Sequence, residues 1–200
     1  VIVISNVENV VIKGFKIRNS ALGSGYGGII VKNSRNVTII DNNVTNCCFG
    51  IWCENMSDSR IEGNIVKRNF ETAVTLTRSN NNKVCENEVK YSTPYGIYIH
   101  QSKNNIVKRN YVAYICQGIR LENSNDNEVA ENFMEKNSPY GISIVNSYEN
   151  NITQNSVVNN NFGIFLQNSE RNFLEANLIT FQSYGISLMD SSDNVLRSNN

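Results

Sequence analysis

Apolar and polar residues alternate in short bursts along this chain of 200 residues, and the bursts return every 22 or 23 residues. Each repeat opens with a burst of the form Gly-Ile-x-Leu and continues with two bursts of the form Val-x-x-Asn-x-Val. Apolar positions such as Ile97 and Ile99 are two residues apart, which is the spacing along one face of a β-strand. The pattern therefore predicts three short strands in every repeat.

Three kinds of residue keep the repeats in register. A glycine followed by isoleucine opens each repeat, a serine follows six residues later, and an asparagine marks a further fixed position. The glycines are Gly28, Gly50, Gly96, Gly118, Gly141, Gly163 and Gly185, with Ala73 in the gap; the serines are Ser34, Ser79, Ser102, Ser124, Ser147, Ser169 and Ser191, with Met56 replacing one; the asparagines are Asn42, Asn64, Asn87, Asn110, Asn132, Asn155, Asn177 and Asn199. Self-similarity at this period indicates a solenoid, and the strand-like spacing argues against leucine-rich and helical repeats.

The predicted fold is all-β: a right-handed, single-stranded parallel β-helix of about eight coils, with three short strands in each coil. Each strand is expected to pair with its counterpart one coil away, about 4.8 Å along the axis. The chain should form one domain over residues 1–200. Neither end shows a polar cap, so we expect a segment of a longer protein with uncapped ends.

Asparagine has two expected roles at the corners of this fold. It tolerates the left-handed backbone conformation that a tight corner requires. Its amide can also hydrogen-bond to the equivalent amide in the next coil. The chain holds a second phased set at the entry to the second strand: Asn82, Asn105, Asn127, Asn150, Asn172 and Asn194. The residue before the glycine is often aromatic, which predicts a stack of rings at another corner: Phe49, Tyr95, Tyr140, Phe162 and Tyr184.

The first turn departs from the regular period. Residues 1–4 align with residues 28–31, a step of 27 residues. The excess is the segment 21–27, which is expected to project as a loop from the corner between the third strand and the next first strand.

Charge and cysteine content narrow the range of partners. Eighteen basic and eighteen acidic residues cancel, and no block of like charge occurs, so nucleic acid is not an expected partner. No apolar run approaches the length of a membrane span. The five cysteines have no regular spacing, which predicts neither a disulfide framework nor a zinc site. A copper site from Cys47, Cys48 and Cys116 is not expected, because Cys116 lies three coils away; no metal or cofactor is predicted.

The repeat itself carries a family resemblance. The phrase Asn-x-Ile/Val-x-x-Asn-x-x-Val followed by Gly-Ile-x-Leu-x-x-Ser-x-x-Asn, as in residues 96–105, resembles the β-helix repeat of the NosD-like and "carbohydrate-binding and sugar hydrolysis" families. The resemblance covers nearly the whole chain, and it implies a pectin-lyase-like fold and an extracellular, cell-surface or periplasmic location. Relatives of this fold include polysaccharide lyases, epimerases and a periplasmic maturation protein for a copper enzyme. In the pectin-lyase-like families the sheet of first strands forms the sugar-binding groove.

Four residues on the outward side of the first strands form a candidate catalytic group. Tyr98 and His100 lie on one coil, and Arg120 and Glu122 are expected on the next. A carboxylate about 5 Å from His100 would favour the imidazolium, and the group could serve a lyase or epimerase that moves a proton on a uronate. The alternative is that they are ordinary surface charges.

The same face holds the candidate carbohydrate-binding residues. Outward aromatic rings at Trp52, Tyr98 and Phe165, with Glu54 beside the tryptophan, could stack on sugars and hydrogen-bond to them. The alternative for Trp52 is a ring covered by a corner loop. Glu54 and Glu122 lie three coils apart, about 14 Å, which is too far for the paired carboxylates of a glycosidase.

The leading functional hypothesis is a non-catalytic β-helix module of an exported or cell-surface protein, which binds a polysaccharide or cell-surface glycan or serves as a scaffold. The first alternative is a lyase or epimerase acting on a uronan, and the second is a NosD-like periplasmic maturation factor. On the third strands Tyr111 and Phe133 form an apolar pair, which could make a lateral contact with another protein or could be scattered surface residues.

Overall fold

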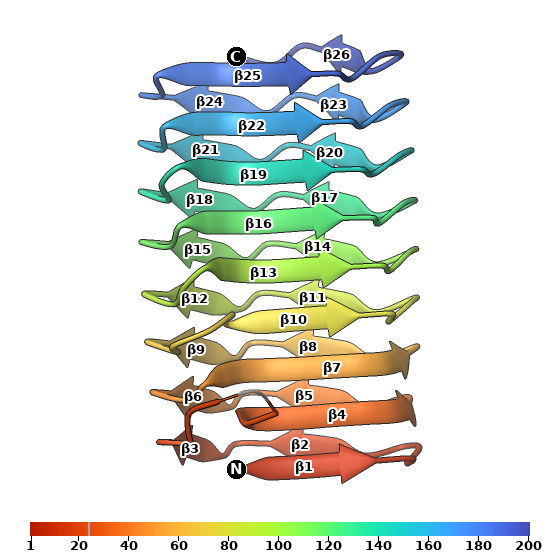
Figure 1. Ribbon diagram of the computed structural model, residues 1–200, viewed down its shortest axis with the longest axis vertical. Helices are drawn as coiled ribbons and strands as arrows, with labels where there is room; N and C mark the ends of the chain where they lie inside the picture. The colour runs from red at the N-terminus through yellow and green to blue at the C-terminus, as the bar shows by residue number, and fades with distance from the viewer. Residues whose placement is uncertain (24) are drawn as a thin grey trace.

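The computed structural model describes residues 1–23 and 25–200 of the chain. The described residues form a β-helix with three strands per coil and contain no helix. Three parallel sheets run the length of the molecule, one of the first strands, one of the second and one of the third. Figure 1 shows the first sheet in front and the other two behind it, and the chain climbs as a right-handed coil. The predicted fold class is therefore confirmed.

The strands have the following bounds. The first sheet contains β1 (Ile2–Ser5), β4 (Gly27–Arg35), β7 (Phe49–Ser57), β10 (Val74–Thr77), β13 (Tyr95–His100), β16 (Gln117–Glu122), β19 (Tyr140–Val145), β22 (Phe162–Gln167) and β25 (Tyr184–Met189). The second sheet contains β2 (Val11–Lys13), β5 (Thr38–Ile40), β8 (Arg60–Glu62), β11 (Lys83–Cys85), β14 (Ile106–Lys108), β17 (Glu128–Ala130), β20 (Asn151–Thr153), β23 (Phe173–Glu175) and β26 (Val195–Arg197). The third sheet contains β3 (Lys16–Arg18), β6 (Asn43–Thr45), β9 (Ile65–Lys67), β12 (Glu88–Lys90), β15 (Tyr111–Ala113), β18 (Phe133–Glu135), β21 (Ser156–Val158) and β24 (Leu178–Thr180).

The register of the sheets follows the repeat. Ile97 pairs with Ile119, and Ile2 pairs with Ile29 across the long first step. The inward side chains fill the coil with isoleucine, valine and leucine, and most are fully buried. No helix in the described ranges, 1–23 and 25–200, is long and apolar enough to cross a membrane.

The asparagine ladder between the second and third strands is also confirmed. In each coil the backbone N–H and the Nδ2 of the ladder residue both donate to Oδ1 of the next ladder asparagine, at 2.8–3.1 Å from Asn42 to Asn199. The left-handed backbone, which was expected at the asparagines themselves, falls instead on the residue before each ladder position. Glu86 and Arg109, for example, have φ of 57° and 55°. The exposed residue turns the corner, and the asparagine points inward and satisfies the backbone.

A further ladder occupies the corner between the third and first strands and was missed in the sequence. Asn69, Ser92, Asn137, Asn160 and Gln182 accept a backbone N–H from the preceding coil. Its signal is weak in the sequence because Cys47 and Ile115 hold two of its positions without a polar side chain that could accept.

The long first step produces the predicted loop between β3 and β4. Leu22 and Tyr26 are exposed there, 63% and 51% respectively. Ser24, which belongs to the same predicted loop, lies outside the described residues. The loop sits beside the beginning of β7, because Cys48 Sγ donates to Gly23 O at 3.2 Å and Phe49 N donates to Tyr26 O at 3.2 Å.

Candidate functional site

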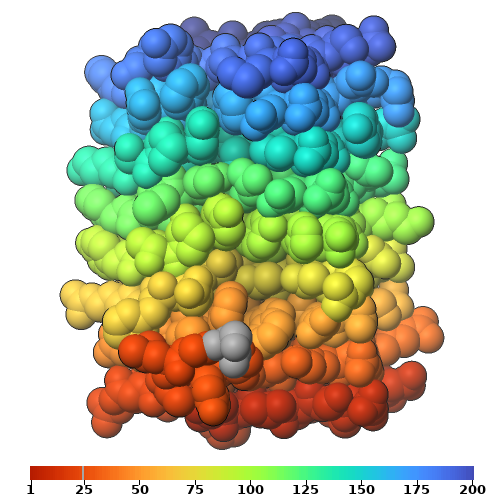
Figure 2. All heavy atoms as spheres, in the orientation of Figure 1, coloured from red at the N-terminus to blue at the C-terminus, as the bar shows by residue number. Residues whose placement is uncertain are grey.

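The outward face of the first sheet carries two columns of side chains in the predicted register, and Figure 2 shows this face with the coils as successive bands. The column nearer the strand starts contains Ile30, Trp52, Thr75, Tyr98, Arg120, Ser143, Phe165 and Ser187. The second contains Lys32, Glu54, Thr77, His100, Glu122, Val145, Gln167 and Met189. Several members of the first column are almost fully covered, so this face is more closely packed than a solvated surface.

Aromatic residues occur on this face as pairs three residues apart. Phe49 lies beside Trp52 with ring centroids 5.2 Å apart, and Tyr95 lies beside Tyr98 at 4.6 Å. A third pair, Phe162 and Phe165, has its centroids 5.8 Å apart. The sequence signal is an aromatic-Gly-Ile-aromatic phrase at 49–52, 95–98 and 162–165. The repeat pattern alone does not indicate this pairing, because the corner ring and the outward ring belong to separate columns.

Trp52 lies within a polar and aromatic cluster on β4 and β7. Lys32 Nζ lies 4.6 Å from the centroid of the Trp52 ring and 3.6 Å from Glu54 Oε2. Arg78, just past β10, pairs with the other oxygen of Glu54. Trp52 is partly exposed. The ring and the Glu54 carboxylate therefore both border solvent, and each is held by a cation.

The rings near β19, β22 and β25 form the predicted corner stack only in part. Phe162 stacks on Tyr184 with centroids 4.7 Å apart and planes at 13°, and Tyr140 is 5.3 Å from Phe162. Nearer the N-terminus, Thr72 and Gln117 interrupt the aromatic column. The Phe165 ring packs against the Tyr140 ring, with centroids 4.8 Å apart, and Phe165 is only 7% exposed. Its ring therefore supports the stack and does not present an open face.

Tyr98, His100, Arg120 and Glu122 lie together on β13 and β16. Tyr98 pairs with Arg120 and His100 pairs with Glu122 in the sheet register. Glu122 Oε2 accepts hydrogen bonds from Tyr98 Oη at 2.6 Å and from Arg120 Nε at 3.0 Å. The His100 imidazole stacks on the Tyr98 ring, with centroids 5.4 Å apart and planes at 17°. The Glu122 carboxylate is thus engaged by Tyr98 and Arg120, while His100 contacts the Tyr98 ring.

The electrostatics of this cluster favour a fixed network. Burial, reinforced by the hydrogen bond to Glu122, raises the pKa of Tyr98 well above its ordinary value. Although burial opposes it, hydrogen bonds from Arg120 and Tyr98 lower the pKa of Glu122. Arg120 Nη1 also donates to Gln117 Oε1 at 3.0 Å, which in turn accepts from Ser143 Oγ at 2.9 Å. A phenol with a raised pKa is a poor base at neutral pH, and the carboxylate is already occupied by two donors.

Carboxylate spacing on this face does not match a glycosidase. Glu54 is followed in register by Thr77, then His100, then Glu122, so the two acids are three coils apart, about 14 Å. Glycosidase pairs lie within about 10 Å of each other.

Tyr111 and Phe133 are neighbours on the third sheet, with ring centroids 5.5 Å apart. Tyr111 Oη donates to Glu135 Oε2 at 3.0 Å, and Lys90 Nζ lies 4.2 Å from the Tyr111 ring. Phe133 is 41% exposed. A lateral protein contact through this pair stays a prediction.

One protein-family model matches almost the whole chain. It is the model described as "Periplasmic copper-binding protein (NosD)", and it matches residues 2–138 and, in a second overlapping match, residues 89–200. A search of curated proteins gave no sequence match.

Several solved structures share this fold, among them an alginate epimerase, a bacteriophage tailspike protein and a DFA-IIIase. The periplasmic alginate epimerase AlgG superposes with a TM-score of 0.79 at 16% identity, over 87% of this chain and 47% of that chain. The enzymatically active domain of tailspike protein 2 from bacteriophage CBA120 gives 0.74 at 13% identity, over 87% and 32%. DFA-IIIase from Arthrobacter chlorophenolicus A6 gives 0.63 at 14% identity, over 76% and 41%. The chain thus spans less than half the length of each of these proteins, and identities this low establish the fold alone.

The residues present do not fit a copper site. Copper favours thiolate, thioether and imidazole donors that converge on one point. Cys47 and Cys48 are buried and donate to backbone carbonyls, and burial raises the pKa of the Cys53 thiol. Burial, with Glu62 beside it, also raises the pKa of the Cys85 thiol. Residues 1–23 and 25–200 contain no group of three histidine, cysteine or acidic side chains that could hold a metal ion.

Proposed function

The chain belongs to the NosD family, and from this premise we propose that it is a non-catalytic, carbohydrate-binding β-helix module of a protein exported to the periplasm or the cell surface. The family is described as periplasmic and so is the alginate epimerase, and both support an exported or periplasmic location. The neighbour named as an alginate epimerase supports a glycan as the partner.

The observation that carries the proposal is the set of aromatic pairs on the first sheet. Each pair combines a ring at the strand start with a ring on the outward column, as in Phe49 with Trp52 and Tyr95 with Tyr98. An extended polysaccharide laid along the helix axis would meet these two pairs about 10 Å apart, because they lie two coils from each other. Aromatic rings give apolar contact to the faces of sugars, and Glu54, His100 and Arg120 beside them provide hydrogen bonds to hydroxyl groups.

A binding module accounts for the charged cluster better than a lyase or an epimerase does. Both reactions need a group that takes the proton next to the uronate carboxylate and a cation that neutralises that carboxylate. The pKa of Tyr98 is raised and its hydroxyl donates to Glu122, and Arg120 is already paired with Glu122. The network therefore favours rigid positioning of the binding face.

We expect Trp52→Ala to weaken retention on a glycan about tenfold, because loss of one well-packed aromatic contact is worth on the order of 1.4 kcal/mol. The measurement is affinity electrophoresis on a panel of neutral and acidic polysaccharides. Phe15→Ala is the matched control, because Phe15 is a 50% exposed ring at another corner. Retention of the unchanged chain and both variants to the same extent on every glycan would remove the first-sheet binding site.

A second experiment separates module from enzyme. We expect no unsaturated product absorbing in the ultraviolet and no exchange of the uronate C5 proton with solvent, on alginate or pectate, with or without calcium. His100→Ala and Tyr98→Phe should change neither readout. Turnover that falls 10²–10⁴-fold in His100→Ala, the usual contribution of a positioned acid or base, would show that the cluster is catalytic.

A further inference from the structure

The third sheet carries a concentration of positive charge near the start of the stack. Of the charged side chains on β3, β6, β9 and β12, Lys16, Arg18, Lys67 and Lys90 are cationic and Glu88 is acidic. Arg68 follows directly after β9 and is exposed. The whole chain is neutral, so this excess is local.

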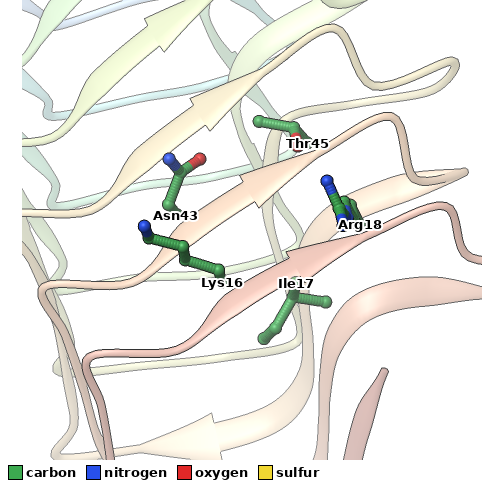
Figure 3. A pocket seen from close by; sticks show the side chains of 5 residues that line it. All are labelled: Lys16, Ile17, Arg18, Asn43 and Thr45. Carbon is green, nitrogen blue, oxygen red and sulfur yellow. The ribbon is translucent and has the colours of Figure 1, made fainter.

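Two neighbouring concavities lie over these residues. The first, about 420 Å³, is lined by Lys16, Ile17, Arg18, Asn43 and Thr45. Figure 3 shows Lys16 beside Asn43 on one part of the strand pair and Arg18 beside Thr45 on the other. The second, about 300 Å³, is lined by Thr45, Asn46, Lys67, Arg68 and Tyr91. Thr45 borders both, so the two concavities are adjacent, and together they are here called the basic groove.

The charge in the basic groove is only partly neutralised. Lys67 and Lys90 both pair with Glu88 Oε1 at 2.8 Å, and these two contacts lower the pKa of Glu88. Lys16, Arg18 and Arg68 make no ion pair with any residue of the described ranges. Asp41, at the adjacent corner, is paired with Lys13 at 3.6 Å. Three cations therefore border the groove without a carboxylate partner.

The uncharged groups of the groove suit a sugar. Asn43 Oδ1 is enclosed and accepts no hydrogen bond from the described residues, so a sugar hydroxyl that reached it would satisfy it. Tyr91 is 48% exposed; Tyr114 stacks on it with ring centroids 5.0 Å apart, and the guanidinium of Arg68 lies 5.9 Å from its centroid. The exposed part of the ring offers apolar contact to a pyranose, and the guanidinium beside it can donate to the oxygens of the sugar.

We propose that the basic groove binds an acidic saccharide, with the carboxylate of a uronate residue between Lys16 and Arg18 and a neighbouring sugar ring against Tyr91. The site lies on the third sheet and shares no residue with the first-sheet face, so it stands independently of the function proposed above. A phosphodiester chain is a poorer match, because it brings no hydroxyl donor from its phosphates to Asn43 Oδ1.

The test is the affinity of a fluorescently labelled oligogalacturonate for the 200-residue chain, measured by anisotropy at low and moderate salt. We expect the double variant Lys16→Ser/Arg18→Ser to bind at least tenfold more weakly and Tyr91→Ala to bind severalfold more weakly. The matched control is Lys83→Ser/Lys103→Ser, which removes two exposed cations from the second sheet and from the corner after β13. It should stay within twofold of the unchanged chain.

Four results would overturn the proposal: an equal loss in the control, equal binding of a neutral galactan oligomer, tighter binding of single-stranded DNA than of the uronan, or a loss in Trp52→Ala without any loss in the double variant. Thermal melting verifies that each variant is folded. If the double variant does not fold, Arg68→Asn replaces it, because asparagine tolerates the left-handed backbone of that position, and its affinity should fall at least threefold.

Discussion

Asn110→Ala is expected to lower the free energy of unfolding by about 3–5 kcal/mol, because it leaves several buried groups without partners, each costing about 1–3 kcal/mol. Asn110 is 1% exposed. Its Nδ2 donates to Val84 O at 2.8 Å and to Asn132 Oδ1 at 2.9 Å. Its Oδ1 accepts the backbone N–H of Asn87 at 3.0 Å and the Asn87 side chain at 2.9 Å. Alanine restores none of these contacts, and the cavity is too enclosed for bulk water to replace them.

Urea denaturation of the variant and of Asn161→Ala measures the effect. Asn161 is exposed, its backbone is not left-handed, and its side chain makes no hydrogen bond to the described residues, so this control should change stability by less than about 0.5 kcal/mol. Asn125 is a less suitable control, because its Oδ1 accepts Tyr148 N at 2.9 Å. Similar losses in Asn110→Ala and Asn161→Ala would mean that the ladder does not support the fold.

Asn110→Ser should recover part of the loss. At the neighbouring corner Ser92 occupies a ladder position and its Oγ accepts the backbone N–H of Asn69 at 3.1 Å. A serine at 110 can accept the Asn87 N–H in the same way but cannot also reach Val84 O. We therefore expect its stability to lie between those of the unchanged chain and Asn110→Ala.

The fold could be predicted because every coil satisfies its buried backbone groups with the same residue types at the same positions. The asparagine at 110 recurs at 87 and 132, and each satisfies the backbone of the coil before it. The backbone conformation of the corner could not be read as easily. The left-handed position holds residues as different as Gly63, Arg109 and Ala176, so no residue type marks it in the sequence.

The candidate site was predicted in its register but not in its contacts. Alternation on a strand fixes that Tyr98 lies beside Arg120, because the period of two leaves no other choice. Which donors reach the Glu122 carboxylate depends on side-chain rotamers, and these select Tyr98 and Arg120 over His100. The basic groove was missed for a different reason. Its cations lie as far apart in sequence as Lys16 and Arg68, and a neutral total charge conceals them.

Gly96→Ala is expected to cost about 3 kcal/mol, at the upper end of overpacking penalties in a close-packed interior. A methyl group at Gly96 would lie 2.4 Å from the carbonyl oxygen of Gly118 and 2.6 Å from Val112 Cγ1. The Gly118 carbonyl belongs to the backbone of the next coil, so it cannot swing away as a side-chain end can. Where the chain has alanine at this register position, at Ala73, the strand starts later. Its strand, β10, begins at Val74, one residue after the alanine, whereas β13 begins at Tyr95, one residue before its glycine.

Chemical denaturation of three variants tests this explanation. Gly27→Ala is the matched control, because Ile30 Cγ1 and Phe49 O would both lie 3.2 Å away, so a shift of a few tenths of an ångström would suffice and the cost should be less than about 1 kcal/mol. Ala73→Gly should also cost less than about 1 kcal/mol, through greater freedom of the unfolded chain. A loss in Gly96→Ala no larger than in Gly27→Ala would show that the coils can move apart to admit a methyl group. The repeated Gly-Ile step would then reflect strand entry alone, and close approach of neighbouring coils would not be what requires glycine there.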